Sequence, residues 1–249
     1  MLENGCEAPG SVDRVLVKRM IRVCPETVVW LYGDHTPTRV RYQKGSRPGL
    51  ERYVEKAVAA CGTDEERIAG ICGFCCGLTK RATEDLDGMR LGGLEEDIIR
   101  RGSDWCTEIA RVACVLCQVA GLPARIVYLF DIGQAYSGHA IIEVYREGTW
   151  GAVCPETDVI YRHADRRPAT TWDLQNDPSM IEGHYRGPET LYTTVGQFRG
   201  AAVSNYFVWE WRKYDYTVSG VNDYYRSILE MSLKGWPGGL RWLHGEASQ

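Results

Sequence analysis

The sequence lacks several features that would place a chain in a special class of protein. No apolar run approaches the ~20 residues that a membrane-spanning helix requires, so we expect no membrane partner. The opening residues, MLENGCEAPGS, have neither the basic start nor the apolar stretch of a secretory signal, which predicts a cytoplasmic protein. The chain contains no internal repeat and no low-complexity tract. These absences predict an ordinary globular chain.

Basic residues are not in excess either. The 249 residues include 29 lysines and arginines against 33 aspartates and glutamates, which gives a formal net charge of -4. A general nucleic-acid binder normally shows a basic excess, so this balance argues against nucleic acid as a partner. The hydrophobic share of 44% and the charged share of 25% are ordinary for a globular protein. A chain of this length is able to bury a substantial core.

Cysteine is abundant, but its density is far below that of a small disulfide-linked domain. In a reducing compartment we expect most of the ten cysteines to be free thiols that pack as small hydrophobic side chains. Two pairs have the C-x-x-C spacing of zinc ligands, Cys72 with Cys75 and Cys114 with Cys117. Both pairs fall in predicted helices with apolar neighbours, so we interpret them as core residues and expect no metal site.

The order of the predicted elements indicates an α+β fold. Helices are expected at 12–23, 50–60, 63–82 and 103–121, with strands at 27–33 and 38–43 and a polar loop at 83–97. Three more strands are expected at 124–130, 139–145 and 149–153, the last two joined by a turn at 146–148. Helices followed by adjacent strands favour an antiparallel sheet over alternating βαβ units.

One cysteine and one histidine stand out by their positions. Cys106 lies at the start of the predicted helix at 103–121, where unpaired N–H groups and the helix dipole favour a thiolate. The same helix start supplies backbone donors for an oxyanion. His139 opens a strand directly after Gly138, whose missing side chain leaves room for a substrate. The two residues are 33 positions apart, a gap that a helix, a turn and a strand can fill while bringing them together.

The segment from Gly102 to Glu156 resembles the core of the transglutaminase-like superfamily. The matching elements are, in order, Gly102-Ser103-Asp104-Trp105-Cys106, Gly121-Leu122-Pro123-Ala124-Arg125, Gly138-His139-Ala140, Glu143-Val144-Tyr145 and Gly148-Thr149-Trp150. The resemblance implies a papain-like core in which N-terminal helices pack on an antiparallel sheet. It also implies a Cys-His-Asp triad, which works without a cofactor.

The sequence departs from the family pattern at the third member of the triad. Where the family has an Asp-Pro pair, this chain has Cys154-Pro155, followed by Glu156. A neutral thiol is a weak acceptor and a poor orienter of an imidazole, so three interpretations stay open. Cys154 bonds the imidazole as a modified third member, Glu156 or Asp158 serves as the acid, or the site only binds its substrate. If Cys106 and Cys154 approach within bonding distance, a disulfide would switch the enzyme off.

These residues predict a cysteine-dependent amide-bond hydrolase, a peptidase or amidase that works through a thioester. Cys106 attacks the carbonyl carbon, and His139 takes the thiol proton and later protonates the leaving amine. The third catalytic residue is expected to be Cys154. Contacts with a peptide, amide or glycan-like substrate are expected from Trp105, Gly138, Glu156 and Asp158. The alternatives are an acyltransferase of transglutaminase type, a catalytically weakened binding protein and a carbohydrate-processing enzyme.

We expect one transglutaminase-like domain over 1–249. Its catalytic core, 46–165, lies between an N-terminal helix and hairpin extension at 1–45 and an aromatic-rich extension at 166–249. In this last part, helices are predicted at 171–183 and 221–234, with an aromatic run at 205–225. Aromatic faces suit sugar rings, so the run is either a wall of a substrate groove or a core strand with its edge. Arg125 is interpreted as a structural anchor beneath the site.

Overall fold

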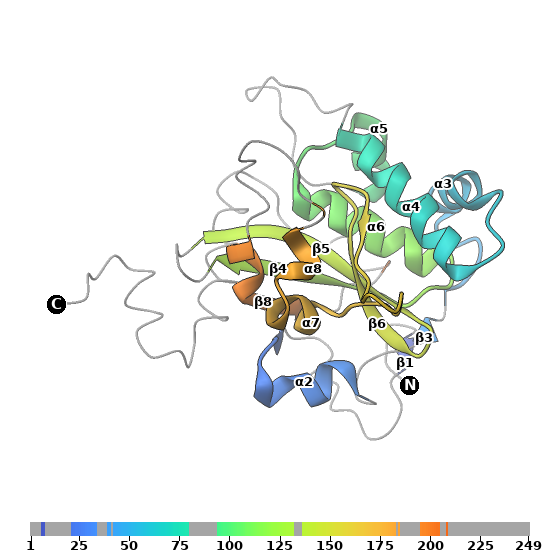
Figure 1. Cartoon of the computed structure of the whole chain (residues 1–249). Coiled ribbons are helices and arrows are strands. Elements are labelled where there is room, and N and C mark those ends of the chain that lie inside the picture. The colour runs from blue at the N-terminus through green and yellow to red at the C-terminus, as the bar shows by residue number, and fades with distance from the viewer. Residues whose placement is uncertain are drawn as a thin grey trace.

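An antiparallel sheet lies at the centre of the fold (Figure 1). The structure is a computed structural model that describes residues 6–7, 21–33, 39–40, 42–79, 94–131, 136–182, 184, 195–204 and 208. The strands of the sheet lie in the order β2 (Ile21–Arg22), β8 (Gly200–Ser204), β4 (Ala124–Asp131), β5 (Tyr136–Arg146), β6 (Thr149–Cys154) and β7 (Val159–Ile160). A smaller sheet pairs β1 (Cys6–Glu7) with β3 (Arg39–Val40).

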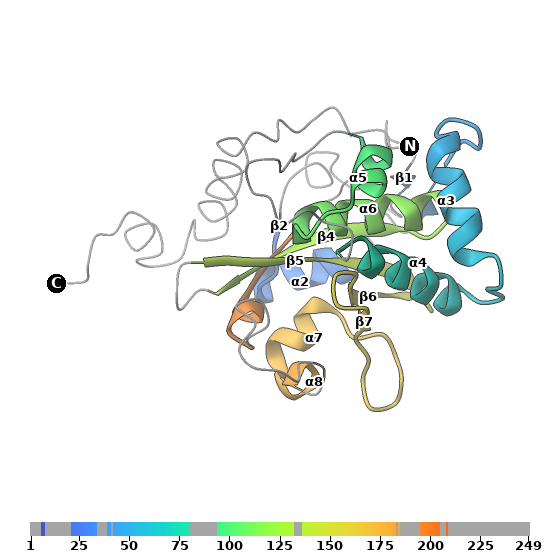
Figure 2. The ribbon, with the colours of Figure 1, turned by 90° about the horizontal axis from the view of Figure 1, so that it is seen from above.

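Helices cover both faces of the central sheet (Figures 1 and 2). One face carries α3 (Pro48–Val58), α4 (Asp64–Thr79), α5 (Glu95–Arg101) and α6 (Cys106–Val119). The other carries α2 (Pro25–Tyr32), α7 (Thr171–Asn176), α8 (Ser179–Glu182) and the 3-10 helix η2 (Val195–Arg199). The predicted α+β class, with helices packed on an antiparallel sheet, is confirmed. Within the described residues, none of the helices has the length and apolar character needed to cross a bilayer.

The helix α6 is buried along most of its length. Every residue from Thr107 to Gln118 is buried, between α3, α4 and α5 on one side and β4 and β5 on the other. The helix ends in a Schellman motif, in which the Leu122 N–H donates to the Cys117 carbonyl at 2.8 Å. Gly121 adopts a φ of 85° there, a left-handed conformation that glycine reaches without strain. The sequence therefore predicts this helix end correctly.

The hairpin of β5 and β6 is also where the sequence places it. Its turn residues Glu147 and Gly148 have φ values of 53° and 79°, the left-handed geometry of a tight two-residue hairpin turn. The register pairs Ile142 with Val153. Continued past the end of β6, this register sets position 156 opposite position 139. Because side chains alternate along a strand, Cys154 then lies on the same face as His139.

Local capping overrides strand propensity near the N-terminus. The sequence predicts a strand at 27–33 from its β-branched and aromatic residues, but this segment is α2, so that prediction is wrong. Pro25 takes the first helical position, where its fixed φ suits a helix, and the Cys24 N–H donates to Thr27 Oγ1 at 3.1 Å. Most of the helix expected at 12–23 lies outside the described residues. Its end, 21–22, is strand β2, because it pairs with β8.

Two further boundaries differ from the sequence prediction. The loop expected at 83–97 gives way to α5 from Glu95 onward, because Ile98 and Ile99 bury against the core. The helix expected at 171–183 is divided into α7 and α8 at Asp177 and Pro178. Apart from Val208, the aromatic run at 205–225 and the helix expected at 221–234 lie outside the described residues.

A buried ion pair joins β4 to β5 on the face opposite α6. Arg125 Nε donates to Glu143 Oε2 at 2.8 Å, and the guanidinium lies 4.0 Å from the centre of the Trp150 ring. The other carboxylate oxygen of Glu143 accepts from the Tyr32 hydroxyl at 2.8 Å and from the Thr171 N–H at 2.7 Å. These contacts tie α2 and α7 to the sheet, which is the structural role expected of Arg125.

Two side chains hold the backbone of Val208 against the helical layer. The Val208 N–H donates to Gln118 Oε1 of α6 at 2.9 Å, and the Val208 carbonyl accepts from Arg47 Nη1 at 2.6 Å. Gln118 Nε2 in turn donates to the Ala124 carbonyl at 3.0 Å. Both Gln118 and Val208 are buried. The chain that leaves β8 is therefore fixed to the same helix that begins at Cys106.

We expect Gln118→Leu to lower the free energy of unfolding by about 1–3 kcal/mol, because it leaves the buried Val208 N–H and Ala124 carbonyl without partners. Urea unfolding of the full chain measures this change. Gln43→Leu is the matched control, since Gln43 is exposed and its replacement should stay within about 0.5 kcal/mol of wild type. Equal stabilities for the two variants would contradict the role given to Gln118.

Candidate active site

The candidate nucleophile is the first residue of α6. Cys106 is half-buried and carries a free thiol. The residue before it, Trp105, is the N-cap, with an extended backbone and no side-chain cap on the helix. N–H groups in the first turn of a helix are the donors that stabilise an oxyanion beside such a sulfur. The start of α6 therefore combines a partly accessible thiol with the backbone geometry that acyl transfer requires.

A buried acidic residue fixes the approach to this helix start. Glu108, which is 2% exposed, accepts from the Ser103 hydroxyl at 2.6 Å and from Arg101 Nη2 at 2.5 Å. The Ser103 hydroxyl oxygen accepts from the Trp105 N–H at 3.1 Å. Gly102 makes the turn into this segment with a φ of 80°. Sequence reasoning missed Glu108, although an acid in the first turn of a helix is a recognisable stabilising signal.

The imidazole of His139 meets three other side chains. Its Nε2 lies 3.2 Å from Cys154 Sγ. Its Nδ1 lies 3.3 Å from Glu156 Oε2, which is close enough for an ion pair but is not aligned as a hydrogen bond. The Cys106 side chain also acts on the ring and raises its pKa. The structure thus brings together Cys106, His139, Cys154 and Glu156, from the start of α6, from β5 and from the end of β6.

The charges at the imidazole follow from these contacts. Burial alone would lower the pKa of His139, but the charge of Cys154 and hydrogen bonds with Cys106 and Cys154 hold this pKa well above its ordinary value. Burial would raise the pKa of Cys154, yet the imidazole and hydrogen bonds with His139 and Thr157 bring it below its ordinary value. Both shifts act in the direction that favours a thiolate on Cys154 beside an imidazolium on His139.

Glu156 is the weaker of the two negative partners of His139. Burial raises the pKa of Glu156, against the opposing charge of His139 and with a further contribution from Asp104. A carboxyl that retains its proton more readily offers less negative charge to the ring. Cys154, at the position of the family's aspartate, is therefore the main charge partner of the imidazole.

The other residues expected at the site differ in how close they lie to Cys106 and His139. Trp105 is half-buried beside Cys106, and Gly138 precedes His139 in β5. Asp158 instead faces α4, where it hydrogen-bonds the Cys72 thiol, and a side chain at Gly73 would lie 3.7 Å from its Oδ2. Of the two acids considered as partners of the imidazole, Glu156 is the one with a described contact to it.

Four cysteines of α4 and α6 belong to the core. Cys72 and Cys75 of α4 and Cys114 and Cys117 of α6 are buried among apolar side chains as free thiols. Burial raises the pKa of the Cys117 thiol to about 12, so it stays protonated. No group of His, Cys, Asp and Glu in the part of the chain that the structure describes has the arrangement of a metal site.

Part of the chain matches a known protein family. Residues 52–155 match the model of the Transglutaminase-like superfamily. This range contains Cys106, His139 and Cys154 and ends one residue before Glu156. No curated protein and no solved structure matches the chain.

Proposed function

We propose that the transglutaminase-like segment of this chain is a thiol hydrolase that cleaves an amide bond through a thioester on Cys106. The supporting observation is the shared imidazole: the Cys106 side chain, at the start of α6, raises the pKa of His139, while Cys154 contacts Nε2 of the same ring. A sulfur at a helix start beside a basic ring is the arrangement that activates a thiol for attack on a carbonyl. The substrate class that suits this chemistry is a peptide or a simpler amide.

The reaction needs one proton acceptor and one oxyanion site. His139 takes the thiol proton as Cys106 Sγ attacks the carbonyl carbon, and the backbone N–H groups at the start of α6 stabilise the oxyanion. The carbon–nitrogen bond then breaks as His139 returns the proton to the amine. Water attacks the thioester, gives a proton to His139, and releases the acid. Cys106 leaves as the thiolate and recovers its proton from His139.

The two thiols compete for one imidazole. When Cys154 is the thiolate, its proton resides on His139, which then cannot accept the proton of Cys106. Cys106 becomes the thiolate only if Cys154 takes its proton back or if a second proton leaves the site. An aspartate at 154 would avoid this competition, because a carboxylate is already ionised above about pH 4. Cys154 is therefore expected to make the site slower than a Cys-His-Asp triad.

We expect Cys154→Asp to speed the alkylation of Cys106 by iodoacetamide roughly tenfold near about pH 6. As the pH falls, wild type loses the Cys154 charge when the thiolate is protonated, whereas the aspartate keeps its charge to lower pH. The acid limb of the rate profile should therefore shift to lower pH in the variant. Peptide mapping of the labelled protein across about pH 5–9 measures the effect at Cys106 alone.

Cys154→Ser is the matched control for this experiment. It removes the competing thiol but supplies no negative charge, so its alkylation rate at low pH should stay below that of Cys154→Asp. Identical profiles for wild type and Cys154→Asp, with both proteins folded by circular dichroism, would show that Cys154 does not act on the imidazole.

An activated ester tests hydrolysis against acyl transfer. With p-nitrophenyl acetate, Cys106 should be acetylated with release of p-nitrophenolate, and intact mass should show one acetyl group that water then removes. If added glycinamide both speeds turnover and appears as acetylglycinamide, the chain is an acyltransferase of the alternative class. If Cys106 remains unacetylated, the binding-protein alternative gains support. We also propose a cytoplasmic location, since the reaction requires reduced thiols.

A further inference from the structure

A buried arginine at the far end of β5 has no described partner. The Arg146 side chain is 3% exposed, and none of its Nε, Nη1 and Nη2 atoms makes a hydrogen bond. A guanidinium keeps its proton in proteins, so this residue places a full positive charge in the interior. Burial and the neighbouring Arg162 both lower the pKa of Arg146. An unpaired interior charge is strongly unfavourable, which points to a missing negative partner.

The fold makes room for this guanidinium. A Cβ atom on Gly151 of β6 would lie 2.7 Å from Arg146 Nη1 and 2.7 Å from Pro168 Cβ. Only glycine therefore leaves space at position 151 for Arg146 to lie across β6. Pro168 pairs with Arg162 in an isolated β-bridge, which closes the loop 163–167 beside the guanidinium. Arg166 in this loop has a left-handed φ of 71°, an uncommon conformation for arginine.

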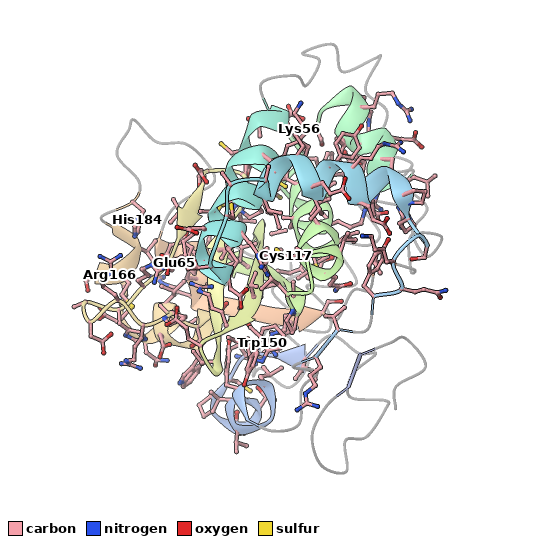
Figure 3. All side chains as sticks on the ribbon, turned by 90° about the vertical axis from the view of Figure 1, so that its right-hand side faces the viewer. Lys56, Glu65, Cys117, Trp150, Arg166 and His184 are labelled. Carbon is pink, nitrogen blue, oxygen red and sulfur yellow. The ribbon has the colours of Figure 1, made fainter. Side chains whose placement is uncertain are left out.

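The positive charge of a second arginine, Arg162, acts on Arg146. Arg162 Nη2 forms an ion pair with Glu65 of α4, and its Nη1 donates to the Arg166 carbonyl at 2.8 Å. Figure 3 shows Glu65 and Arg166 close together at one edge of the molecule. Glu65 is thus committed to Arg162, and the other acid that acts on Arg146, Glu147, is exposed on the hairpin turn. Among the described residues, Arg146 therefore has no acid as a direct ion-pair partner of its own.

We propose that Arg146 and Arg162 form a binding site for a phosphoryl group. Two guanidinium forks offer parallel N–H donors to the oxygens of a tetrahedral dianion, and this is the ligand geometry that arginine serves best. The ligand supplies the negative charge that Arg146 lacks and relieves the repulsion between the two arginines. Free phosphate and a phosphate ester present the same chemistry to this pair.

The loop 163–167 runs from Arg162 to Pro168, which lies beside the guanidinium of Arg146. Its contacts are largely internal, with Arg167 Nε donating to Asp165 Oδ2 at 2.6 Å and the Arg166 N–H donating to the His163 carbonyl at 2.9 Å. Because the Arg146 side chain is 3% exposed, a ligand reaches it only when a neighbouring segment moves, and this exposed loop is the candidate. The Arg146 site lies seven residues along β5 from His139, about 23 Å at the rise of a strand. It is therefore independent of the proposed hydrolase function.

Thermal unfolding of the full chain in inorganic phosphate tests this site. At constant ionic strength set with sodium chloride, the midpoint should rise with the logarithm of the phosphate concentration, by about 5–10 °C at a hundredfold excess over the dissociation constant. Arg146→Met should abolish the rise. It should also raise the midpoint without phosphate, because an apolar side chain replaces an unpaired buried charge. Arg167→Met, at an exposed position outside the pair, should keep the full phosphate response.

A second variant and a direct binding measurement complete the test of the phosphoryl site. If Arg146→Met does not fold, Arg162→Met takes its place, and calorimetric titration of the wild type with phosphate measures binding directly. Phenyl phosphate distinguishes the source of the group: a response to it assigns a phosphate ester, and a response to phosphate alone assigns the free ion. A wild-type midpoint that does not rise at constant ionic strength overturns the proposal, as does an equal rise in the folded Arg146 or Arg162 variant. Neither result depends on the reactivity of Cys106.

Discussion

Replacing Cys106 with alanine is expected to abolish turnover of p-nitrophenyl acetate, with a loss of about 10³-fold or more, because Cys106 is the proposed nucleophile and is partly exposed at the start of α6. In wild type, a dilute dose of iodoacetamide near neutral pH should label Cys106 first. His139→Ala should slow this labelling by roughly 10²-fold, because the ring no longer accepts the thiol proton.

Three other cysteines serve as internal controls for this labelling. Cys24, Cys61 and Cys76 are also half-buried, so they report what exposure alone contributes to reactivity. They should label more slowly than Cys106 in wild type and at unchanged rates in His139→Ala. If Cys106 labels no faster than these three, or if His139→Ala slows all four alike, the assignment of Cys106 as an activated nucleophile is wrong.

Arg125→Met is expected to lower the free energy of unfolding by about 3–5 kcal/mol, because it breaks a buried ion pair. The substitution leaves the Glu143 carboxylate buried without its cation. It also removes the Nη1 donor of the Leu31 carbonyl, at 2.7 Å, and the stacking on Trp150. Urea unfolding followed by circular dichroism measures the loss.

A double variant separates the charge from the packing. Glu143→Gln keeps an oxygen acceptor for the Tyr32 hydroxyl and the Thr171 N–H but carries no charge. In Arg125→Met/Glu143→Gln no unpaired carboxylate remains, so the double variant should lose less stability than Arg125→Met alone. If the losses simply add, the buried ion pair does not explain the effect and packing around Trp150 does.

Local signals in the sequence predict the elements that position the candidate site. Gly121 marks the end of α6, and the pair Glu147-Gly148 marks the β5–β6 turn. Each acts through the conformation of one or two residues, which a sequence displays directly. The strand expected at 27–33 fails because its β-branched residues favour a strand, while Pro25 and Thr27 fix a helix start.

Local sequence signals do not predict contacts between side chains that are far apart in the sequence. The contact between Glu156 and His139 depends on the register of β5 against β6, which the turn alone suggests but does not fix. Glu108 supports the start of α6 through Arg101 and Ser103, and its role depends on where those two side chains lie. Val208 is bonded to Gln118, 90 residues away, and to Arg47, 161 residues away. The unpartnered charge of Arg146 becomes visible only when its surroundings are known.

The burial of α6 has a consequence for how the reactive sulfur behaves over time. The helix is buried from Thr107 to Gln118 and ends in the Schellman motif. Its hydrogen bonds should therefore break only when the whole domain unfolds. Its amide hydrogens should thus be among the last to exchange with deuterium. Cys106 is the first residue of this slowly exchanging helix. Local unfolding at the surface should therefore leave the Cys106 sulfur in place beside the His139 imidazole.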